Sequence, residues 1–161
     1  HESELRGKEF VTRKITYQLA QLKVKGGPAL QLGNLSASRD WGYADDYVRA
    51  ISLITNADLC DDFVVATNVL NTVRSFFRLA ALNIGFEPMF DGEGLDEKCY
   101  DQKSGRLLCE VKSDFFRDPD TKALRGDFSK ISKTLGWKPT TSFEKLVEIM
   151  ALFDLRQAEG Q

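Results

Sequence analysis

Positively charged side chains next to predicted ordered structure are the residues of this sequence best suited to binding chemistry. Arg13 and Lys14 adjoin in a predicted helix, Arg39 follows a glycine-containing loop, and Arg117 lies in a loop rich in acids. A guanidinium group can donate to two phosphate oxygens at once, whereas a lysine offers a single point charge. These cations are therefore candidates for holding phosphate, although each taken alone could also be a solvated surface charge.

Residues typical of catalysis are missing from the sequence. The one histidine is His1, so no internal histidine can serve as a base or as a metal ligand. The pair Gly92 and Gly94 lacks the third glycine of a dinucleotide-binding loop, and no lysine motif of the Walker type occurs. No tyrosine precedes a lysine by four residues, the arrangement that activates a phenol for hydride transfer. We predict no catalytic residue in these 161 positions.

The three cysteines do not form a recognisable framework. Cys60, Cys99 and Cys109 are odd in number and have no close paired spacing. This pattern argues against both a set of disulfides and a zinc site. We expect buried or idle thiols and no bound metal.

Length and composition indicate one ordinary globular domain, or part of one. The 161 residues are 42% hydrophobic and 29% charged, and 22 basic residues face 24 acidic ones. Such a balance creates no field that would gather nucleic acid or an anionic membrane. No apolar run approaches the roughly 18 residues of a membrane helix, and no signal peptide begins the chain. We therefore expect no nucleic-acid or membrane partner and a cytoplasmic location.

The elements that must position the cations follow from hydrophobic periodicity, which alternates between helical and strand spacing through most of the chain. An α/β arrangement is indicated. The predicted helices cover residues 10 to about 24, 45–54, 72–84, 127–135 and 141–153, and the predicted strands cover residues 29–32, 62–67, 86–90 and 107–111.

Polar residues at the predicted helix starts are candidate caps, since their side chains can accept unpaired amide hydrogens. Asp45 and Asp46 precede a helix whose inner face would carry Tyr47, Ile51 and Ile54. For the later helices we expect a cap at Asn71 or Thr72, a cap at Asp127, and a capping box of Thr141 with Glu144.

Several strings of the sequence match one group of proteins almost from end to end. The chain resembles the extended short-chain dehydrogenase/reductases that act on nucleotide sugars, and most closely the GDP-mannose 4,6-dehydratases. The string at 135–139 is common across the wider superfamily, whereas those at 10–15 and 39–42 are far more specific. The matching strings are His1-Glu2-Ser3, Arg6-Gly7, Phe10-Val11-Thr12-Arg13-Lys14-Ile15, Leu32-Gly33-Asn34-Leu35, Arg39-Asp40-Trp41-Gly42, Asp46-Tyr47-Val48, Asp62-Phe63-Val64, Ala66-Thr67, Val73-Arg74, Gly126-Asp127 and Leu135-Gly136-Trp137-Lys138-Pro139.

This resemblance implies a fold and an extent. Residues 1–161 would be the carboxy-terminal part of an extended Rossmann-type nucleotide-sugar dehydratase, including its small substrate-binding domain. The chain begins at His1 without an initiator methionine. We therefore expect it to be a piece of a longer protein whose amino-terminal, NADP-binding Rossmann half is absent.

The resemblance also implies site residues. Val11 and Lys14 would face the GDP moiety, Arg39 would contact the diphosphate, and Arg117 with Asp120 would complete the nucleotide pocket. The spacing of Val11 and Lys14 is compatible with this role, because residues three positions apart lie on one face of a helix.

The resemblance further implies contacts to a cofactor and to other subunits. His1 and Arg6 would touch NADP, which the absent half would mainly bind. The arginine loop would lie near a subunit interface, so the complete enzyme would be a homo-oligomer.

The implied activity is that of an NADP-dependent lyase acting on GDP-mannose. Such an enzyme oxidises the mannose at its fourth carbon, eliminates water across the fifth and sixth carbons, and returns the hydride to the sixth. The product is GDP-4-dehydro-6-deoxymannose. The catalytic groups would lie in the absent half, so we expect the isolated chain to be inactive. The alternatives are a non-catalytic nucleotide-sugar-binding module and a related GDP-sugar epimerase or reductase.

Overall fold

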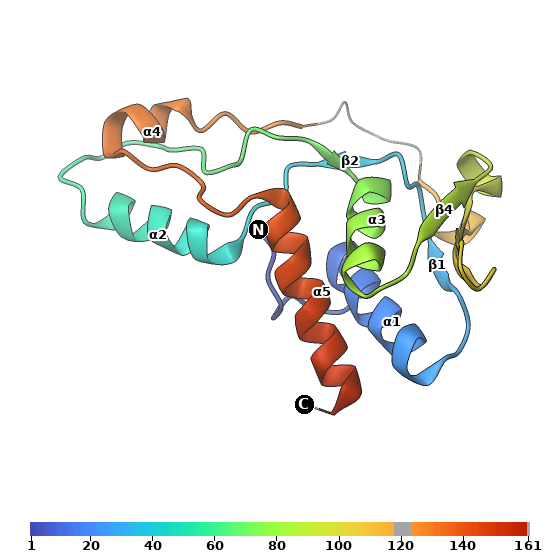
Figure 1. The fold of residues 1–161 in the computed structure, drawn as a ribbon. Helices are drawn as coiled ribbons and strands as arrows, with labels where there is room; N and C mark the ends of the chain where they lie inside the picture. The colour runs from blue at the N-terminus through green and yellow to red at the C-terminus, as the bar shows by residue number, and fades with distance from the viewer. Residues whose placement is uncertain (118–123, 161) are drawn as a thin grey trace.

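The computed structural model describes residues 1–117 and 124–160, which form two regions (Figure 1). The first region, called the body, holds a sheet and the helices α1 (Val11–Lys25), α3 (Val73–Asn83) and α5 (Phe143–Glu159). The second region, called the arm, projects beside it and consists of α2 (Ala44–Thr55), residues 56–70, α4 (Ser129–Leu135) and residues 136–141. Within the described residues, no helix is long and apolar enough to cross a membrane.

The sheet of the body mixes parallel and antiparallel strands. Its strand order is β1 (Leu30–Leu32), β6 (Leu107–Val111), β5 (Lys98–Asp101) and β4 (Pro88–Asp91). The β1–β6 pair is parallel, and the other two pairs are antiparallel. A separate two-stranded ribbon joins β2 (Ser38–Arg39) to β3 (Asn71–Thr72). The α/β class expected from the sequence is confirmed, and β2, β3 and β5 are strands that the sequence did not predict.

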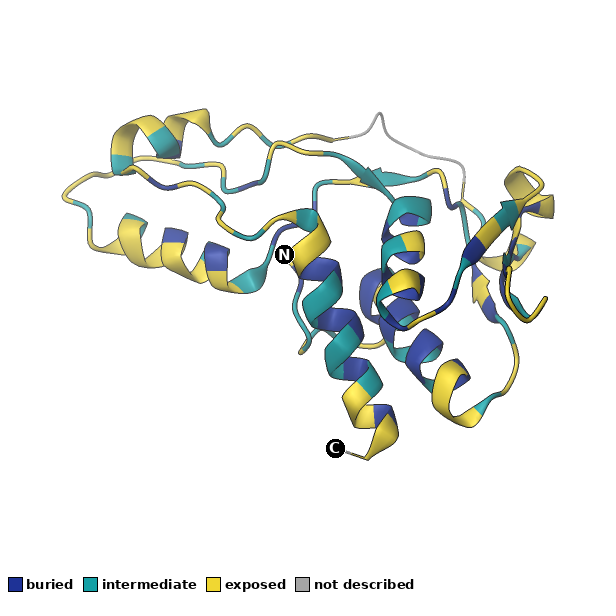
Figure 2. Cartoon of the chain, viewed as in Figure 1, coloured by how far each residue is buried: buried dark blue, intermediate teal, exposed yellow. Residues whose placement is uncertain are grey.

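The core of the body lies where α1, α3 and α5 meet the sheet. Each helix contributes an apolar stripe at helical spacing, and Figure 2 shows these stripes as the buried faces of the three helices. Ile15, Leu19, Phe76, Phe77 and Met150 are fully buried there. The stripes predicted from the sequence for these three helices are therefore confirmed.

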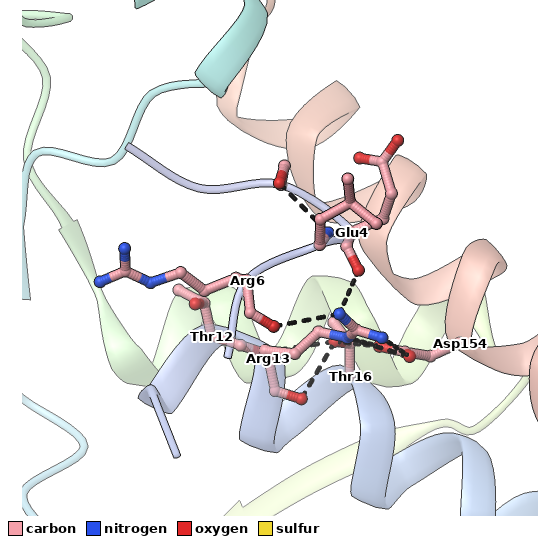
Figure 3. Close-up of polar contacts among 8 residues, drawn as sticks. Glu4, Arg6, Thr12, Arg13, Thr16 and Asp154 are labelled. Atoms are coloured by element: carbon pink, nitrogen blue, oxygen red, sulfur yellow. Dashed lines mark hydrogen bonds and ion pairs between the residues drawn. The ribbon is translucent and has the colours of Figure 1, made fainter. Parts of the chain in front are cut away.

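A buried ion pair joins the first and last helices of the body (Figure 3). The Arg13 guanidinium on α1 lies 2.9 Å from the Asp154 carboxylate on α5, and Thr16 Oγ1 donates to the same carboxylate at 2.7 Å. The guanidinium also donates to the backbone carbonyls of Glu4 and Arg6. Arg13 therefore fastens the segment before α1 to the body.

The arm has a much smaller core. Ala50, Ile131 and Trp137 form its buried hydrophobic cluster within the described chain, and Phe63 and Val65 pack against them. Ala66 is buried outside this cluster. The indole Nε1 of Trp137 donates to the backbone carbonyl of Asp46 at 2.9 Å, which joins α2 to the segment after α4.

Two expectations for α2 are wrong. The helix starts at Ala44 with no side-chain cap, and the buried Asp46 carboxylate instead accepts hydrogen bonds from Thr140 and Thr141. Ile51 is 57% exposed rather than inward, since Asp46 and Ala50 occupy the buried face.

The predicted strand at residues 62–67 is also not observed. This segment has no place in a ladder, because no other strand of the described chain lies beside it. The Phe63-Val64-Val65 sequence favours a strand, but a strand requires a hydrogen-bonding neighbour.

The predicted helix caps hold in part. Thr72 caps α3 by accepting from the Ser75 amide at 3.0 Å, as expected. Ser142 caps α5 in place of the predicted Thr141, so the expected capping box does not form. Asp127 accepts from the Ser129 amide at 2.8 Å, one residue before the assigned cap of α4.

The three cysteines are free thiols. Cys99 and Cys109 are buried as paired residues on β5 and β6, whereas Cys60 is exposed in the arm. The hydrogen bond with the neighbouring Cys99 thiol, together with burial, raises the pKa of Cys109, so this thiol stays protonated.

Candidate functional site

Four of the residues predicted to bind a nucleotide line one cavity of about 550 Å³. It opens between the start of α1, the end of β1, the β2 strand and the short 3-10 turn η2 (Ser113–Phe115). Asp120, the fifth predicted residue, lies outside the described residues. The lining consists of Glu9, Val11, Lys14, Leu32, Gly33, Asn34, Ala37, Arg39, Trp41, Val73, Asp114, Phe115 and Arg117.

Lys14 reaches into this cavity from the first turn of α1. Its Nζ donates to the backbone carbonyl of Gln31 on β1 at 2.7 Å and lies 4.4 Å from the centre of the Phe115 ring. Burial lowers the pKa of Lys14, because desolvation disfavours its charged form. Val11 lies one turn earlier on the same face, so an apolar and a cationic group are adjacent in the wall.

Arg39 and Arg117 bring two exposed guanidinium groups to the cavity. Arg39 is fixed by the β2–β3 pairing, where it faces Asn71, and its Nη1 donates to the Ser38 carbonyl at 2.8 Å. Arg117 follows η2 and has no hydrogen-bond or ion-pair partner within the described chain. Both groups therefore keep donors available for an anion.

A close backbone approach shapes one edge of the cavity. A Cβ atom built on Gly33 would lie 2.1 Å from the backbone oxygen of Phe115. No side chain fits at that distance, so the glycine allows η2 and the residues up to Arg117 to lie against the end of β1. No pattern in the sequence predicted this contact.

Sequence reasoning also missed three lining side chains. Trp41 is 7% exposed and stacks on Phe143 with the ring centres 6.2 Å apart. Phe115 is 49% exposed, so one apolar ring stands at the mouth of the cavity. Asn34 also lines the cavity, and its Oδ1 accepts from the Ser36 amide at 2.9 Å, whereas its amide nitrogen has no hydrogen-bond partner in the described chain. Trp41 and Asn34 could have been found, because both lie in strings that carry the family resemblance.

The electrostatics of the cavity suit an anion. Lys14, Arg39 and Arg117 outnumber the two acids of the lining, Glu9 and Asp114. The described lining contains no histidine, cysteine or tyrosine, and its titratable groups are the carboxylates of Glu9 and Asp114 and the three cations. Elsewhere in the described chain, no group of three possible metal ligands occurs. The excess of cations equips the cavity to bind an anionic ligand.

His1 and Arg6, the predicted cofactor contacts, lie outside this cavity. The His1 ring packs against Tyr47, with the ring centres 5.2 Å apart. The Arg6 guanidinium lies 3.6 Å from the centre of the Phe10 ring, and its Nε lies 3.5 Å from Glu2 Oε2. That buried Nε makes no hydrogen bond within the described chain, and Figure 3 shows the Arg6 side chain pointing away from Arg13.

Comparison with protein families gives one match over most of the chain. A family model described as GDP-mannose 4,6 dehydratase matches residues 1–150. The chain is 41% identical over 160 residues to GDP-mannose 4,6 dehydratase 2 of Caenorhabditis elegans, covering 99% of this chain and 42% of that protein. It is 43% identical over 161 residues to GDP-mannose 4,6 dehydratase 2 of Arabidopsis thaliana, covering 100% and 39%. The chain thus spans about two fifths of the length of these relatives.

Solved structures show the same fold at low sequence identity. The RMD protein of Pseudomonas aeruginosa, complexed with NADPH, matches with a TM-score of 0.74 at 16% identity, covering 94% of this chain and 44% of that one. The dTDP-glucose 4,6-dehydratase of Bacillus anthracis, in complex with NAD, matches with a TM-score of 0.70 at 14% identity, covering 98% and 43%. The fold is therefore that of part of a Rossmann-type dehydratase or epimerase.

Proposed function

We propose, since this chain belongs to the GDP-mannose 4,6-dehydratase family, that it is the GDP-sugar-binding, carboxy-terminal portion of such an enzyme. The observation that supports this most directly is the cavity in which Val11, Lys14, Arg39 and Arg117 come together. These residues are spread over more than 100 positions of the sequence. Together they give the cavity the positive charge that binding of a nucleoside diphosphate requires.

Each lining group has a role in the proposed complex. Arg39 holds the diphosphate, and Lys14 exchanges its hydrogen bond to Gln31 for one to a phosphate oxygen. Val11 packs against the nucleoside. Arg117 completes the nucleotide pocket together with Asp120, a role that follows from the resemblance.

The proposal also includes a nicotinamide cofactor, which would contact the chain outside this cavity. Arg6 has a buried Nε without a hydrogen bond and terminal nitrogens without partners in the described chain, so its guanidinium can meet a phosphate. In the proposed enzyme, Arg6 and His1 touch NADP at the border of this portion. The cofactor supplies hydride transfer, and the rest of its site belongs to an amino-terminal Rossmann half.

The proposed whole enzyme converts GDP-mannose to GDP-4-dehydro-6-deoxymannose with loss of water. It is a lyase, a homo-oligomer and a cytoplasmic protein. The isolated 161 residues bind without turnover, because the catalytic groups that the resemblance implies belong to the amino-terminal half. The second candidate is a nucleotide-sugar-binding module that acts without chemistry, and the excess of cations in the cavity fits this candidate too.

Calorimetry of GDP binding to the chain tests the proposed pocket. We expect saturable binding by the wild-type chain and roughly 10- to 100-fold weaker binding by Arg39→Ala, the size of one charge-assisted hydrogen bond. Arg156→Ala is the matched control, because Arg156 is exposed on α5 and does not line the cavity. Absence of binding at millimolar GDP, or equal loss in both variants, would contradict the proposal.

A turnover assay separates the two candidates. Dehydrated product formed from GDP-mannose by the isolated chain would contradict a purely binding role for these residues. Product formed only when the remaining part of a family member is supplied would favour the enzyme over the module.

A further inference from the structure

Glu97 is a buried carboxylate that does not line the nucleotide cavity. It is 2% exposed and lies between the short 3-10 turn η1 (Gly94–Asp96) and the start of β5. A buried charge is costly unless it is paired and hydrogen-bonded. The partner of Glu97 connects it to the wall of the cavity.

This partner is Arg74, on the first turn of α3, which meets the carboxylate with two hydrogen bonds. Its Nε donates to Glu97 Oε1 at 2.6 Å, and its Nη2 donates to Glu97 Oε2 at 2.9 Å. The same Nη2 donates to Ser36 Oγ at 3.2 Å. Bidentate pairing of arginine with a carboxylate fixes direction as well as distance. Arg74 is therefore held in one orientation between Glu97 and Ser36.

The start of α3 is also bonded through its backbone to the loop at residues 34–37, which forms one wall of the cavity. The Val73 amide donates to the Ala37 carbonyl at 3.0 Å, and the Arg74 amide donates to the Leu35 carbonyl at 2.9 Å. Ala37 and Val73 themselves line the cavity. The position of Arg74 therefore determines where this wall lies.

The backbone of Glu97 holds a second wall. Its carbonyl accepts from the amide of Val111, the last residue of β6, at 3.0 Å. Two residues later the chain enters η2, and Asp114, Phe115 and Arg117 line the cavity from there. Glu97 thus connects two walls of the cavity, one through its side chain and the other through its backbone.

The separation of these walls matters because the two exposed cations of the cavity belong to different walls. Arg39 follows the loop at residues 34–37, whereas Arg117 follows η2. Both guanidinium groups can contact one nucleotide only when the walls keep a fixed separation. Hydrogen bonds weaken steeply once their geometry is lost, so a small shift of one wall reduces affinity without unfolding the chain.

We propose that Glu97 and Arg74 are positioning residues of the nucleotide site, whose pairing sets the separation of the two walls and thereby the affinity for a nucleoside diphosphate. This inference rests on the proposed function, which assigns the nucleotide to the cavity. Neither residue touches the ligand. Buried ion pairs can often be replaced by apolar residues without loss of stability, so stability alone does not account for this pair.

Calorimetry of GDP binding to the 161-residue chain tests this role. Arg74→Lys keeps a positive charge beside Glu97 but cannot form the two parallel bonds. We expect Arg74→Lys and Glu97→Gln each to bind GDP at least fivefold more weakly, with the stoichiometry and far-UV circular dichroism of the wild type. Equal affinity of both variants and the wild type overturns the inference.

Matched substitutions outside the cavity serve as controls. Arg78→Lys changes an exposed arginine one turn further along α3, and Glu87→Gln changes a carboxylate that pairs with Lys103 at the surface. Neither residue lines the cavity. We expect both controls to change the affinity for GDP less than twofold, and a loss as large as that of Arg74→Lys overturns the inference.

The folded fraction separates positioning from a merely structural role. Unfolding alone weakens binding fivefold only when about one fifth of the chains remain folded, because the apparent Kd rises as the competent fraction falls. Circular dichroism would show such a loss of helix. A displaced wall instead raises the Kd of a fully folded chain. Weaker binding that is matched by lost helical signal in both variants overturns the inference.

A double variant shows whether the two residues act as one unit. Arg74→Lys combined with Glu97→Gln should bind GDP within about twofold of the weaker single variant, because both changes break the same contact. Multiplication of the two single effects overturns the inference.

Failure of this inference and failure of the proposed function give different results. Wild-type binding of GDP that persists at full strength in Arg74→Lys and Glu97→Gln overturns the inference alone and leaves the proposed pocket intact. Absence of binding by the wild-type chain contradicts the proposed pocket, and the positioning role is overturned with it.

Discussion

The body and the arm of this molecule are stabilised in different ways. The body buries large side chains of three helices against its sheet, among them Phe76, Phe77 and Met150. The buried hydrophobic residues of the described arm are few, namely Ala50, Ala66, Ile131 and Trp137, and polar contacts supplement them. Burial of large apolar side chains is the main source of stability, so the body is expected to hold by itself and the arm to be weaker.

One carboxylate joins the two regions. Asp40 follows β2 and accepts from the amides of Thr67 and Asn68 at 3.0 and 2.9 Å and from the Gly126 amide at 3.3 Å. Thr67 Oγ1 donates to it at 2.5 Å. Three chain segments therefore depend on a single side chain at the base of the arm.

The largest effect is expected from the ion pair of the body. Arg13→Ala leaves the buried Asp154 carboxylate without its guanidinium partner. Removing one member of such a pair costs about 3–5 kcal/mol, because the other charge stays buried. Urea denaturation of the whole chain measures the loss. Arg156→Ala, an exposed change on the same helix as Asp154, should cost less than about 0.5 kcal/mol, and a loss below about 1 kcal/mol for Arg13→Ala would contradict the prediction.

A smaller and more local effect is expected from the core of the arm. Trp137→Ala removes the largest side chain of that cluster, at a cost of roughly 3 kcal/mol. We expect arm amides to exchange at least tenfold faster while the unfolding midpoint of the body stays nearly constant. Trp137→Phe, which keeps a ring and loses the hydrogen bond to the Asp46 carbonyl, should have a weaker effect. If Trp137→Ala lowers the body's unfolding midpoint as far as Arg13→Ala does, the two regions form one cooperative unit.

The smallest effect is expected from acid. Burial alone would raise the pKa of Asp46, but hydrogen bonds from Thr140 and Thr141 outweigh it and hold the pKa below its ordinary value. The resulting stabilisation is complete above the unfolded pKa near ~4 and is lost as the pH falls through the lower folded pKa. We expect hydrogen exchange of the arm amides, corrected for intrinsic rates, to show that the free energy of local opening falls by about 1 kcal/mol below pH 4. Asp46→Asn should remove this pH dependence, and its persistence would contradict the assignment.

Sequence periodicity predicted the body well, since its helices bury faces that follow a regular spacing. The apolar stripes of α1, α3 and α5 and the strand at residues 107–111 are found where the pattern placed them. The strand β5 was missed because it begins with Lys98 and ends with Asp101, whose carboxylate is fixed by the Glu87 amide. Periodicity fails in the arm, where Asp46 occupies a buried position and residues 62–67 lack the neighbour that their composition implies.

The candidate site could be predicted only in part. The residue types of Arg39 and Arg117 suggested phosphate binding. The family string at 39–42 selected Arg39 from other surface cations, whereas Arg117 was implied by the resemblance without lying in a matching string. Their convergence depends on the β2–β3 pairing and on the contact of Gly33 with Phe115, both of which join distant parts of the chain. Spacing along a sequence carries no information on such contacts.

The contact between Arg13 and Asp154 spans 141 positions, which has a consequence for the order of events during synthesis. A ribosome that adds about 5–20 residues per second needs roughly 10 s to synthesise the residues between them. Throughout that interval the Arg13 guanidinium lacks the Asp154 carboxylate, and the apolar faces of α1 and α3 that pack against α5 are exposed. Folding of the body must therefore wait for its last helix, and this portion is expected to depend on chaperones more than its size would suggest.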